Sequence, residues 1–413
     1  MSAQADHATS AQAALLRQRY CSVRERTEAI AAPLSAEDCC AQSMPDASPV
    51  KWHLAHTAWF FETFILERYL PGFRAFHPAF RMLFNSYYNG VGEKHPRPQR
   101  GLLTRPSLAE VTAYRRSVDE RMLALLARTG AAGELAALTE LGLQHEQQHQ
   151  ELMLTDVKHL LSMNPLKPAY ADAPSIRYDA AEPDAGAPGW VAFDARIAGI
   201  GHEGAGFCFD NELPRHRQFI EPFMLASRLV TNRDYLAFID AGGYRNPALW
   251  LSEGWDWVCA DQLAQPLYWR HAASASTGKW EEFTLQGMQP LDARLPATHL
   301  SYFEADAYAR WAGARLPTEA EWECAAMAST GLAQLFGACW QWTSSSYAPY
   351  PGYVAAAGAV GEYNGKFMVN QYVLRGSSYV TPAGHARASY RNFFPAAARW
   401  QCSGIRLATS GNG

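Results

Sequence analysis

The feature that most constrains the fold is a long run of apolar residues at helical spacing, LTELGLQHEQQHQELMLTDVKHLL, at residues 138–161. Its apolar side chains recur every three or four positions, as they do on a helix that buries one face. The same spacing extends from about residue 12 to 165, with few glycines to interrupt it. Helices of this kind bury their apolar faces against one another, so the N-terminal half is predicted to be a helical bundle.

After residue 189 the pattern changes to short aromatic and β-branched segments separated by Gly, Pro and Asn, which predicts a loop-rich α+β domain. One helix is indicated within it by RLPTEAEWECAAM, where Thr318 is the N-cap and Glu321, three residues later, completes a capping box. Residues 167–188 are rich in Pro, Ala and Asp without a sustained period, as expected of a linker. We therefore expect a two-domain α+β chain, with a bundle at 12–166 and the second domain at 189–410.

The composition limits the class of protein. A chain of 413 residues, 48% hydrophobic and 18% charged, is long enough for two domains with their own cores. A formal net charge of -4 and the lack of any Lys/Arg run argue against a nucleic-acid or membrane partner. The chain has no signal-like N-terminus, no window of about 20 apolar residues that could span a bilayer, and no C-x-x-C spacing among its cysteines. These features indicate a cytoplasmic enzyme with reduced thiols.

Two histidines in HEQQHQE are spaced so that they can share a metal ion. On a helix, His145 and His149 lie about 40° apart on one face, with Cβ atoms roughly 6 Å from each other. Glu151 falls about 200° beyond His149, so it cannot easily be a third ligand from the same helix. His159 shares the face of His145 but lies about 15 Å along the axis from His149, too far for the same ion.

The third ligand is predicted on the upstream helix SPVKWHLAHTAWFFETF. His56 shares an inward stripe with Trp52 and Trp59, whereas His53 lies about 60° to one side of that stripe. A side chain on the inward stripe is better placed to meet a ligand pair on a neighbouring helix. The predicted metal ligands are therefore His56, His145 and His149.

The motif leaves other interpretations open. H-E-x-x-H is also the zinc helix of metalloproteases, in which Glu146 would act as the general base. That mechanism needs Glu146 to face an open zinc position and a third ligand that is usually downstream, whereas the best candidate here lies upstream. A histidine pair at this spacing is also common on solvated helices that bind no metal.

These residues resemble the sulfoxide synthases of ergothioneine biosynthesis over nearly the whole chain. In that family a DinB-like four-helix bundle carries the H-x3-H-x-E motif, here HEQQHQE, and a third histidine from the segment WHLAH. The second half resembles the formylglycine-generating-enzyme-like (C-type-lectin-like) α+β domain through DNELPRH, RLPTEAEWE, WQWTSSSY, YRNFF and GIRLA, in the family's order. The resemblance implies a DinB-like bundle followed by a formylglycine-generating-enzyme-like domain.

The resemblance also implies an activity. The family uses a three-histidine, non-heme Fe(II) site and O2 as co-substrate, which assigns iron to His56, His145 and His149. It joins a sulfur donor to the imidazole of hercynine, the trimethylammonium betaine of histidine, and gives a sulfoxide. Three neutral imidazoles leave the charge of a divalent ion uncompensated and positions vacant, which suits a thiolate or selenolate together with O2.

Two motifs depart from the family pattern. The chain has GACWQWT where GNVWEWT is common, and RGSSY where RGGSC is common. Ala338 and Gln341 remove oxygen ligands from the calcium site of some relatives, so no calcium is expected. Because this domain closes over the bundle in the family, the donor stays open between a thiol and the selenosugar of the related selenoneine synthases. A DinB-type thiol transferase, which would not require O2, leaves the second domain unexplained.

The segment FNSYYNGVGEKHPRPQRG resembles the subgroup whose active-site tyrosines lie in the bundle. The resemblance assigns Tyr87 and Tyr88 to delivery of a proton or an electron. A phenol suits this role because its pKa of about 10 keeps it protonated at neutral pH. Considered without the resemblance, adjacent tyrosines beside an Asn-Gly pair more often pack a turn.

The resemblance further implies substrate-binding residues. Gln148, beside the metal face, is assigned to the hercynine imidazole. An aromatic face attracts a quaternary ammonium, although two phenylalanines also suit a core. The betaine end is accordingly assigned to the YRNFF residues Asn392, Phe393 and Phe394. A guanidinium can bind a carboxylate through two hydrogen bonds, so the polar end of the donor is assigned to Arg97 and Arg100.

Overall fold

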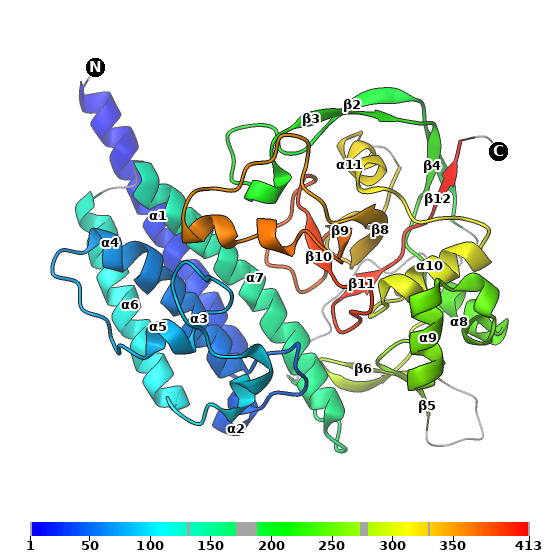
Figure 1. Cartoon of the computed structure of the whole chain (residues 1–413), viewed down its shortest axis with the longest axis horizontal. Helices are drawn as coiled ribbons and strands as arrows, with labels where there is room; N and C mark the ends of the chain where they lie inside the picture. The colour runs from blue at the N-terminus through cyan, green and yellow to red at the C-terminus, as the bar shows by residue number, and fades with distance from the viewer. Residues whose placement is uncertain (1, 130–132, 171–187, 273–279, 329–330, 412–413) are drawn as a thin grey trace. The chain divides into compact units, whose positions relative to one another are not determined.

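The computed structural model of the chain describes residues 2–129, 133–170, 188–272, 280–328 and 331–411 (Figure 1). The chain divides into two compact units. The first holds Met1–Leu166 and Ala356–Tyr363, and the second holds Lys167–Ala355 and Asn364–Gly413. The predicted domain boundaries do not place Ala356–Tyr363 in the first unit. Most of the predicted linker, residues 171–187, lies outside the described residues.

Within the described residues, the first unit is built on four long helices that run alongside one another (Figure 1). They are α1 (Ser2–Ala31), α3 (Val50–Phe61), α6 (Leu108–Thr129) and α7 (Gly133–Met163). Helices α3 and α1 each contact both α6 and α7, as in a four-helix bundle. Shorter elements are α2 (Ala36–Cys40), the π-helix η1 (Glu62–Leu66), α4 (Glu67–Tyr69), α5 (Phe80–Leu83) and the 3-10 helices η2 (Arg97–Leu102) and η6 (Ala359–Glu362). The predicted helical bundle is confirmed.

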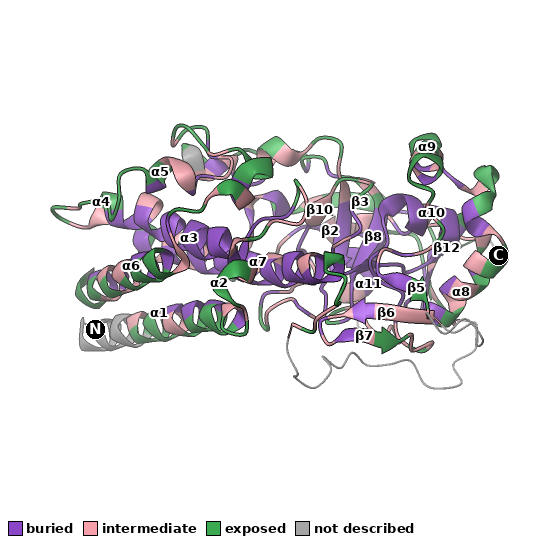
Figure 2. Ribbon diagram, turned by 90° about the horizontal axis from the view of Figure 1, so that it is seen from below, coloured by how far each residue is buried: buried purple, intermediate pink, exposed green. Residues whose placement is uncertain are grey.

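Helix α3 is the innermost element of the bundle. Every residue from Val50 to Phe61 is buried (Figure 2), which agrees with its nearly continuous apolar sequence. A close approach to α7 is possible because position 142 is glycine: a Cβ atom on Gly142 would lie 2.6 Å from Cε1 of Phe61. The absence of that Cβ brings the facing side chains of α3 and α7 within contact distance.

A buried carboxylate on α7 ties the helices together. Glu146 is fully buried and forms ion pairs with Arg24 of α1 at 2.8 Å and with Arg115 of α6 at 2.9 Å. Arg115 also donates to the carbonyl oxygen of Leu54 and the hydroxyl of Thr57, both on α3. Burial alone would raise the pKa of Glu146, but Arg24 and Arg115 lower it to about 2. Because a buried charge is stable only when it is paired, this network determines how α7 is turned about its axis.

Within its described residues, the second unit contains four small sheets. The largest has the order β10-β9-β8-β11 and is antiparallel except where β11 runs parallel to β8. Its strands are β8 (Trp340–Ser346), β9 (Tyr372–Gly376), β10 (Asn392–Phe394) and β11 (Ser403–Gly404). The other sheets pair β1 (Trp190–Phe193), β4 (Phe223–Ala226) and β12 (Ala408–Ser410); β2 (Arg196–Ile200) and β3 (His216–Ile220); and β5 (Trp269–His271), β6 (Trp280–Thr284) and β7 (Gly287–Pro290).

Helices and 3-10 turns connect these strands. They are α8 (Asn232–Asp240), α9 (Ser252–Asp261), α10 (Tyr302–Trp311), α11 (Glu319–Met327), η3 (Asp210–Glu212), η4 (Gly243–Arg245), η5 (Pro247–Leu249) and η7 (Gly365–Phe367). The predicted capping box of α11 is confirmed, since the hydroxyl of Thr318 accepts from the amide of Glu321 and the carboxylate of Glu321 accepts from the amide of Thr318. The predicted α+β character is confirmed as well. None of the helices in the described ranges combines the length and the hydropathy needed to cross a bilayer.

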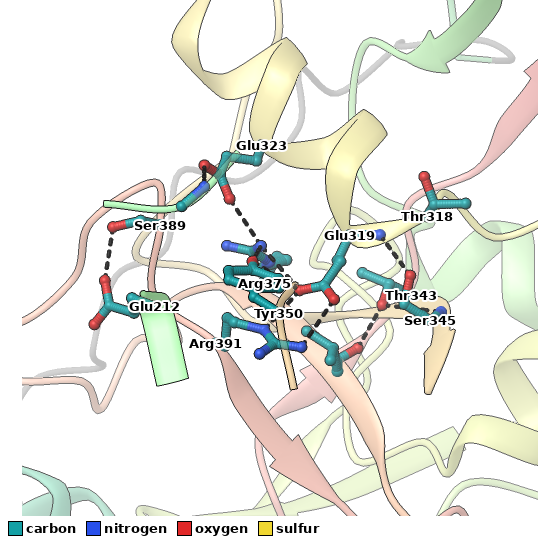
Figure 3. Close-up of polar contacts among 12 residues, drawn as sticks. Glu212, Thr318, Glu319, Glu323, Thr343, Ser345, Tyr350, Arg375, Ser389 and Arg391 are labelled. Carbon is teal, nitrogen blue, oxygen red and sulfur yellow. Dashed lines mark hydrogen bonds and ion pairs between the residues drawn. The ribbon is translucent and has the colours of Figure 1, made fainter. Parts of the chain in front are cut away.

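A buried ion-pair network joins α11 to the largest sheet (Figure 3). Arg375 of β9 donates to Glu319 at 3.0 Å and to Glu323 at 2.8 Å. Arg391, which precedes β10, donates to both carboxylate oxygens of Glu319, at 2.9 and 3.0 Å. Burial alone would raise the pKa of Glu319, but Arg391 and Arg375 lower it below its usual value. Glu319 is therefore ionised in the folded protein and holds the first turn of α11 against the sheet.

We predict that Glu319→Gln destabilises the protein by about 3–5 kcal/mol at neutral pH, because it leaves two buried arginines without their shared charge. The lowered pKa means that the carboxylate stabilises the fold fully above its unfolded value of 4.5 and loses this contribution as the pH falls through the lower folded value. The difference in the free energy of unfolding between wild type and variant should therefore shrink below that pH. Urea unfolding at several pH values measures it.

A matched control for this prediction is Glu253→Gln, which removes an exposed carboxylate at the start of α9. It should leave the free energy of unfolding nearly unchanged at every pH. A constant difference between wild type and Glu319→Gln from neutral pH to acid would contradict the assignment of an ionised Glu319.

Candidate metal centre

Three buried histidines of the first unit converge on one point. One ring nitrogen each of His56, His145 and His149 lies within 4.8 Å of the others, and Nε2 of His56 is 3.2 Å from Nε2 of His145. His56 comes from α3, and the other two come from successive turns of α7. Within the described part of the chain, this is the single group of three or more His, Cys, Asp or Glu side chains arranged in this way. The three predicted ligands are thus brought together.

The ring of His56 is held on both faces and at one edge. It stacks on Trp52, with ring centroids 4.5 Å apart, and on Trp59, with centroids 5.4 Å apart. Its Nδ1 donates to the carbonyl oxygen of Phe84 at 2.6 Å. In the neutral ring this bond leaves the lone pair on Nε2, the nitrogen that faces His145.

The environment keeps all three imidazoles uncharged. Burial lowers the pKa of His56 and of His149 well below the usual range, and the neighbouring His145 lowers both further. Burial also lowers the pKa of His145 to about 3. Nδ1 of His145 is buried without a hydrogen-bond partner among the described residues. Neutral imidazoles with converging lone pairs are a donor set that fits a divalent transition metal, with positions left for other ligands.

His53 lies beside the cluster without joining it. Its Nδ1 is 2.7 Å from Nδ1 of His149, and its Nε2 is 3.1 Å from a carboxylate oxygen of Asp156. Burial lowers the pKa of His53 below its usual value. His53 is not among the predicted metal ligands, and Asp156 is not among the predicted site residues. The available signal was the spacing from His149 to Asp156, seven positions apart, which is two turns on the same helix face.

The metalloprotease interpretation requires Glu146 to face an open metal position. Both of its carboxylate oxygens are instead occupied, one by Arg24 and the other by Arg115, and its side chain is inaccessible to solvent. A carboxylate with a pKa of about 2 that is held by two arginines is a poor base for a metal-bound water. The geometry does not meet the requirement of that interpretation.

The two predicted tyrosines stack on each other near the cluster. The ring centroids of Tyr87 and Tyr88 are 4.6 Å apart, and Tyr88 packs 5.6 Å from Trp59. The side chain of Asn85 closes the turn by accepting from the amide of Tyr88 and donating to its carbonyl oxygen. Burial, followed by the neighbouring Tyr87, raises the pKa of Tyr88 well above its usual value. The phenol is therefore protonated at neutral pH.

A third tyrosine, Tyr363, reaches the cluster from the late segment that joins the first unit. Its ring centroid is 5.7 Å from that of His145 and 6.5 Å from that of Tyr87. Its hydroxyl donates to Oε1 of Gln148, which is 215 positions away in the sequence. The preceding Glu362 accepts from the backbone amides of Asn89 and Gly90. It thereby holds this segment against the turn that follows Tyr87 and Tyr88. The sequence offers no local signal for this contact.

The two predicted arginines differ in their surroundings. Arg100 is buried, donates to the hydroxyl of Ser48 at 2.9 Å and lies 3.3 Å over the ring of Trp52. Burial, followed by repulsion from Arg97, lowers its pKa well below the usual value. In the described part of the chain no carboxylate forms an ion pair with Arg100, whereas Arg97 is exposed. A buried guanidinium in this state is suited to receive an anionic group.

The predicted betaine-binding residues form β10 of the second unit, and all three are partly buried. Phe393 stacks on Tyr347 with ring centroids 4.0 Å apart. Phe394 lies 6.2 Å from Trp400, and the side chain of Asn392 accepts from the amide of Phe393. Their role in binding a substrate remains a prediction from the resemblance.

Gln341, one of the departures from the family pattern, is fully buried in the second unit. Its Oε1 accepts from Nε1 of Trp322 at 2.8 Å and from Nε of Arg406 at 2.7 Å. This oxygen therefore has two donors directed at it, one of them cationic. The expected absence of a calcium site remains a prediction.

Both halves of the chain match known families. Residues 20–153 match the DinB superfamily, and residues 188–331 and 327–410 match the Sulfatase-modifying factor enzyme 1-like domain. Curated relatives span both halves. Hercynine oxygenase of Mycobacterium tuberculosis is 30% identical over 90% of this chain and 93% of its own length. Hercynine oxygenase of Mycolicibacterium thermoresistibile is 30% identical over 88% of each chain.

A further relative is named for ergothioneine biosynthesis. Ergothioneine biosynthesis protein 1 of Schizosaccharomyces pombe is 26% identical over 49% of this chain and 27% of its own length. The two family matches, the near full-length relatives and the histidine cluster agree with the resemblance found in the sequence. The chain is an oxidative enzyme that belongs to the ergothioneine-biosynthesis sulfoxide synthase family, which unites a DinB-like bundle with a formylglycine-generating-enzyme-like domain.

Proposed function

We propose that this enzyme uses O2 to form a carbon–chalcogen bond on the imidazole of hercynine. Non-heme Fe(II) would be held by His56, His145 and His149. The observation that carries the proposal is the convergence of these three buried, neutral imidazoles within 4.8 Å of one another. The near full-length relatives named hercynine oxygenase support the choice of substrate.

The first contribution of the protein to the reaction is the set of three imidazole ligands. Iron held by these three imidazoles would supply redox chemistry with O2. The chain keeps the imidazoles neutral by burial and orients His56 through the carbonyl oxygen of Phe84. Trp52 and Trp59 cover both faces of His56 and exclude water from that side.

Gln148, which lies next to His149 on α7, is assigned to the hercynine imidazole by the resemblance. The hydroxyl of Tyr363 donates to its amide oxygen and so restricts the side-chain rotamer. Asn392, Phe393 and Phe394 are assigned to the betaine end by resemblance, since aromatic faces attract a quaternary ammonium.

Tyr87 and Tyr88 are assigned to proton delivery. The raised pKa of Tyr88 keeps its O–H in place at neutral pH, so the phenol can donate to an oxygen atom that gains charge during the reaction. The stacked neighbour Tyr87 and the nearby Tyr363 extend this phenol group toward His145. The three phenol rings therefore lie together beside the cluster, and the O–H of Tyr363 is donated to Gln148.

Arg100 is assigned, together with the exposed Arg97, to the polar end of the chalcogen donor. The support is a buried guanidinium that donates to Ser48 and feels the charge of Asp156 but forms no ion pair with a carboxylate in the described residues. A carboxylate of a thiol such as cysteine or a hydroxyl group of a selenosugar could accept hydrogen bonds from it. The donor is therefore proposed only as a thiol, giving an ergothioneine-type sulfoxide, or a selenosugar, giving selenoneine.

We predict that His149→Ala loses iron binding, because two imidazoles remain where three converged. The affinity should fall by more than the roughly 100-fold that loss of an outer hydrogen-bond partner can cost. Anaerobic titration with Fe(II), followed by iron analysis of the desalted protein, measures the loss. His159→Ala, which removes a histidine of the same helix that bonds to Ser43, should load iron as wild type does. Full iron occupancy in His149→Ala would remove the ligand assignment.

We predict that Tyr88→Phe or Tyr87→Phe preserves hercynine binding but lowers the rate by about 100-fold or more, or changes the product, since the O–H donor is lost. Calorimetric binding and single-turnover kinetics separate the two effects. Tyr69→Phe, in the same unit but bonded to Glu134, is the control that should keep the wild-type rate. If both active-site variants kept the wild-type rate and product, the proton-delivery role would be refuted.

The proposed reaction is tested by mass spectrometry of the products. Fe(II)-loaded enzyme is given hercynine, a cysteine-type thiol and a selenosugar together, with and without O2. A carbon–sulfur adduct that requires O2 identifies a sulfoxide synthase, and a carbon–selenium adduct identifies a selenoneine synthase. Absence of both adducts in the presence of O2 would overturn the proposal, and an O2-independent thiol transfer would support the DinB-type thiol transferase instead.

A further inference from the structure

A chain of three buried polar side chains leads away from the metal site. His53 of α3 lies between His149 and Asp156 of α7, with Nδ1 2.7 Å from Nδ1 of His149 and Nε2 3.1 Å from Oδ2 of Asp156. The exposed fractions of the three residues are 2%, 9% and 6%. His149 and Asp156 are two turns apart on one face of α7, so a single ring from α3 can bridge them.

The contacts among His149, His53 and Asp156 allow only one placement of the ring hydrogens when His53 is neutral. A carboxylate oxygen only accepts, so Nε2 of His53 must donate to Asp156. A neutral imidazole carries one N–H, so Nδ1 of His53 has the lone pair and must accept from Nδ1 of His149. The lone pair of His149 is thereby confined to Nε2.

Asp156 is itself held in position. The backbone amide of Ser48 donates to the same Oδ2 atom at 2.9 Å. Ser48 lies two residues before α3 and Asp156 lies on α7, so this contact connects the same two helices as His53 does. The acceptor that selects the tautomer of His53 is therefore fixed by the backbone.

We propose that His53 is a positioning residue for the metal site, and that Asp156 acts through it. Asp156 holds His53 with its hydrogen on Nε2, and His53 holds His149 in the tautomer that turns the lone pair of Nε2 toward the metal. In the opposite tautomer, His53 would donate to Nδ1 of His149, whose hydrogen would then sit on Nε2 and block coordination. The inference rests on the metal site of the proposed function, and it is independent of the substrate and of the reaction.

His56, the other ligand whose outer nitrogen has a hydrogen-bond partner, is oriented differently. Nδ1 of His56 donates to a backbone carbonyl, which has no alternative tautomer. The orientation of His149 depends instead on a side chain that can itself change tautomer. Replacing His53 should therefore weaken metal binding through His149 while the hydrogen bond of His56 to Phe84 is unaffected.

The test compares His53→Ala with His53→Asn, using Co(II) as the probe on metal-free full-length protein. The amide oxygen of Asn can stand where Nδ1 of His53 stood and accept from His149, whereas Ala removes the acceptor. We expect Co(II) affinity to fall about 10- to 100-fold in His53→Ala and to return close to wild type in His53→Asn. His159→Ala is the control and should bind Co(II) as wild type does.

Asp156→Ala tests the second link of the chain. It should weaken Co(II) binding in the wild-type background and cause no further loss in the His53→Ala background, because Asp156 acts through His53. Long-range 1H–15N spectra of the metal-free protein, labelled at histidine, provide a readout that needs no metal. They should report hydrogen on Nδ1 of His149 in wild type and on both nitrogens, in exchange, in His53→Ala.

Wild-type Co(II) affinity in His53→Ala, or an unchanged tautomer of His149, would overturn the inference. Equal loss of Co(II) affinity in His53→Asn and His53→Ala, with equal loss of thermal stability, would show that His53 only packs against its neighbours. That result would also overturn the inference. The proposed function fails separately. If no carbon–chalcogen adduct forms while Co(II) affinity still depends on His53, the reaction is wrong and the positioning role stands.

Discussion

The ion pairs of Glu146 with Arg24 and Arg115 are the interaction on which the metal centre depends. The carboxylate is wholly buried, so any rotation of α7 that separated it from either arginine would leave an unpaired charge in the interior. With Glu146 held, His145 and His149 have little freedom in the direction they face. The residue that would be the base of a zinc protease is here the element that orients the ligand helix.

Burial acts on the histidines in two ways. It removes their protons by lowering their pKa values, and it excludes solvent that would compete for their hydrogen bonds. Two of the three outer nitrogens have a partner within the protein, whereas Nδ1 of His145 has none among the described residues. The carbonyl oxygen of Phe84 serves His56, and the His53–Asp156 pair serves His149. A site of neutral ligands thus depends on hydrogen bonds outside it to determine which nitrogens carry lone pairs.

The second half of the sequence also contributes to the first unit. Ala356–Tyr363 belongs to that unit, where Glu362 binds the turn that carries the tyrosines and Tyr363 contacts His145 and Gln148. Tyr363 is 215 positions from Gln148 in the sequence, yet the two side chains are hydrogen-bonded beside the metal centre. Tyr87 and Tyr88 therefore share this site with a residue from a distant segment of the chain. Loss of this segment would remove Glu362, which anchors the turn, and the phenol of Tyr363 beside His145.

The sequence by itself determined the helical bundle, the α+β character of the second half, the capping box of α11 and the pairing of His145 with His149. These features follow from periodicity and short spacings, which translate directly into positions on one helix. Only the tertiary structure decided that Glu146 binds Arg24 and Arg115, that His53 bonds to His149, and that Tyr363 reaches Gln148. Such contacts depend on how separate elements pack, and spacing along the chain carries no information about which distant side chains will meet.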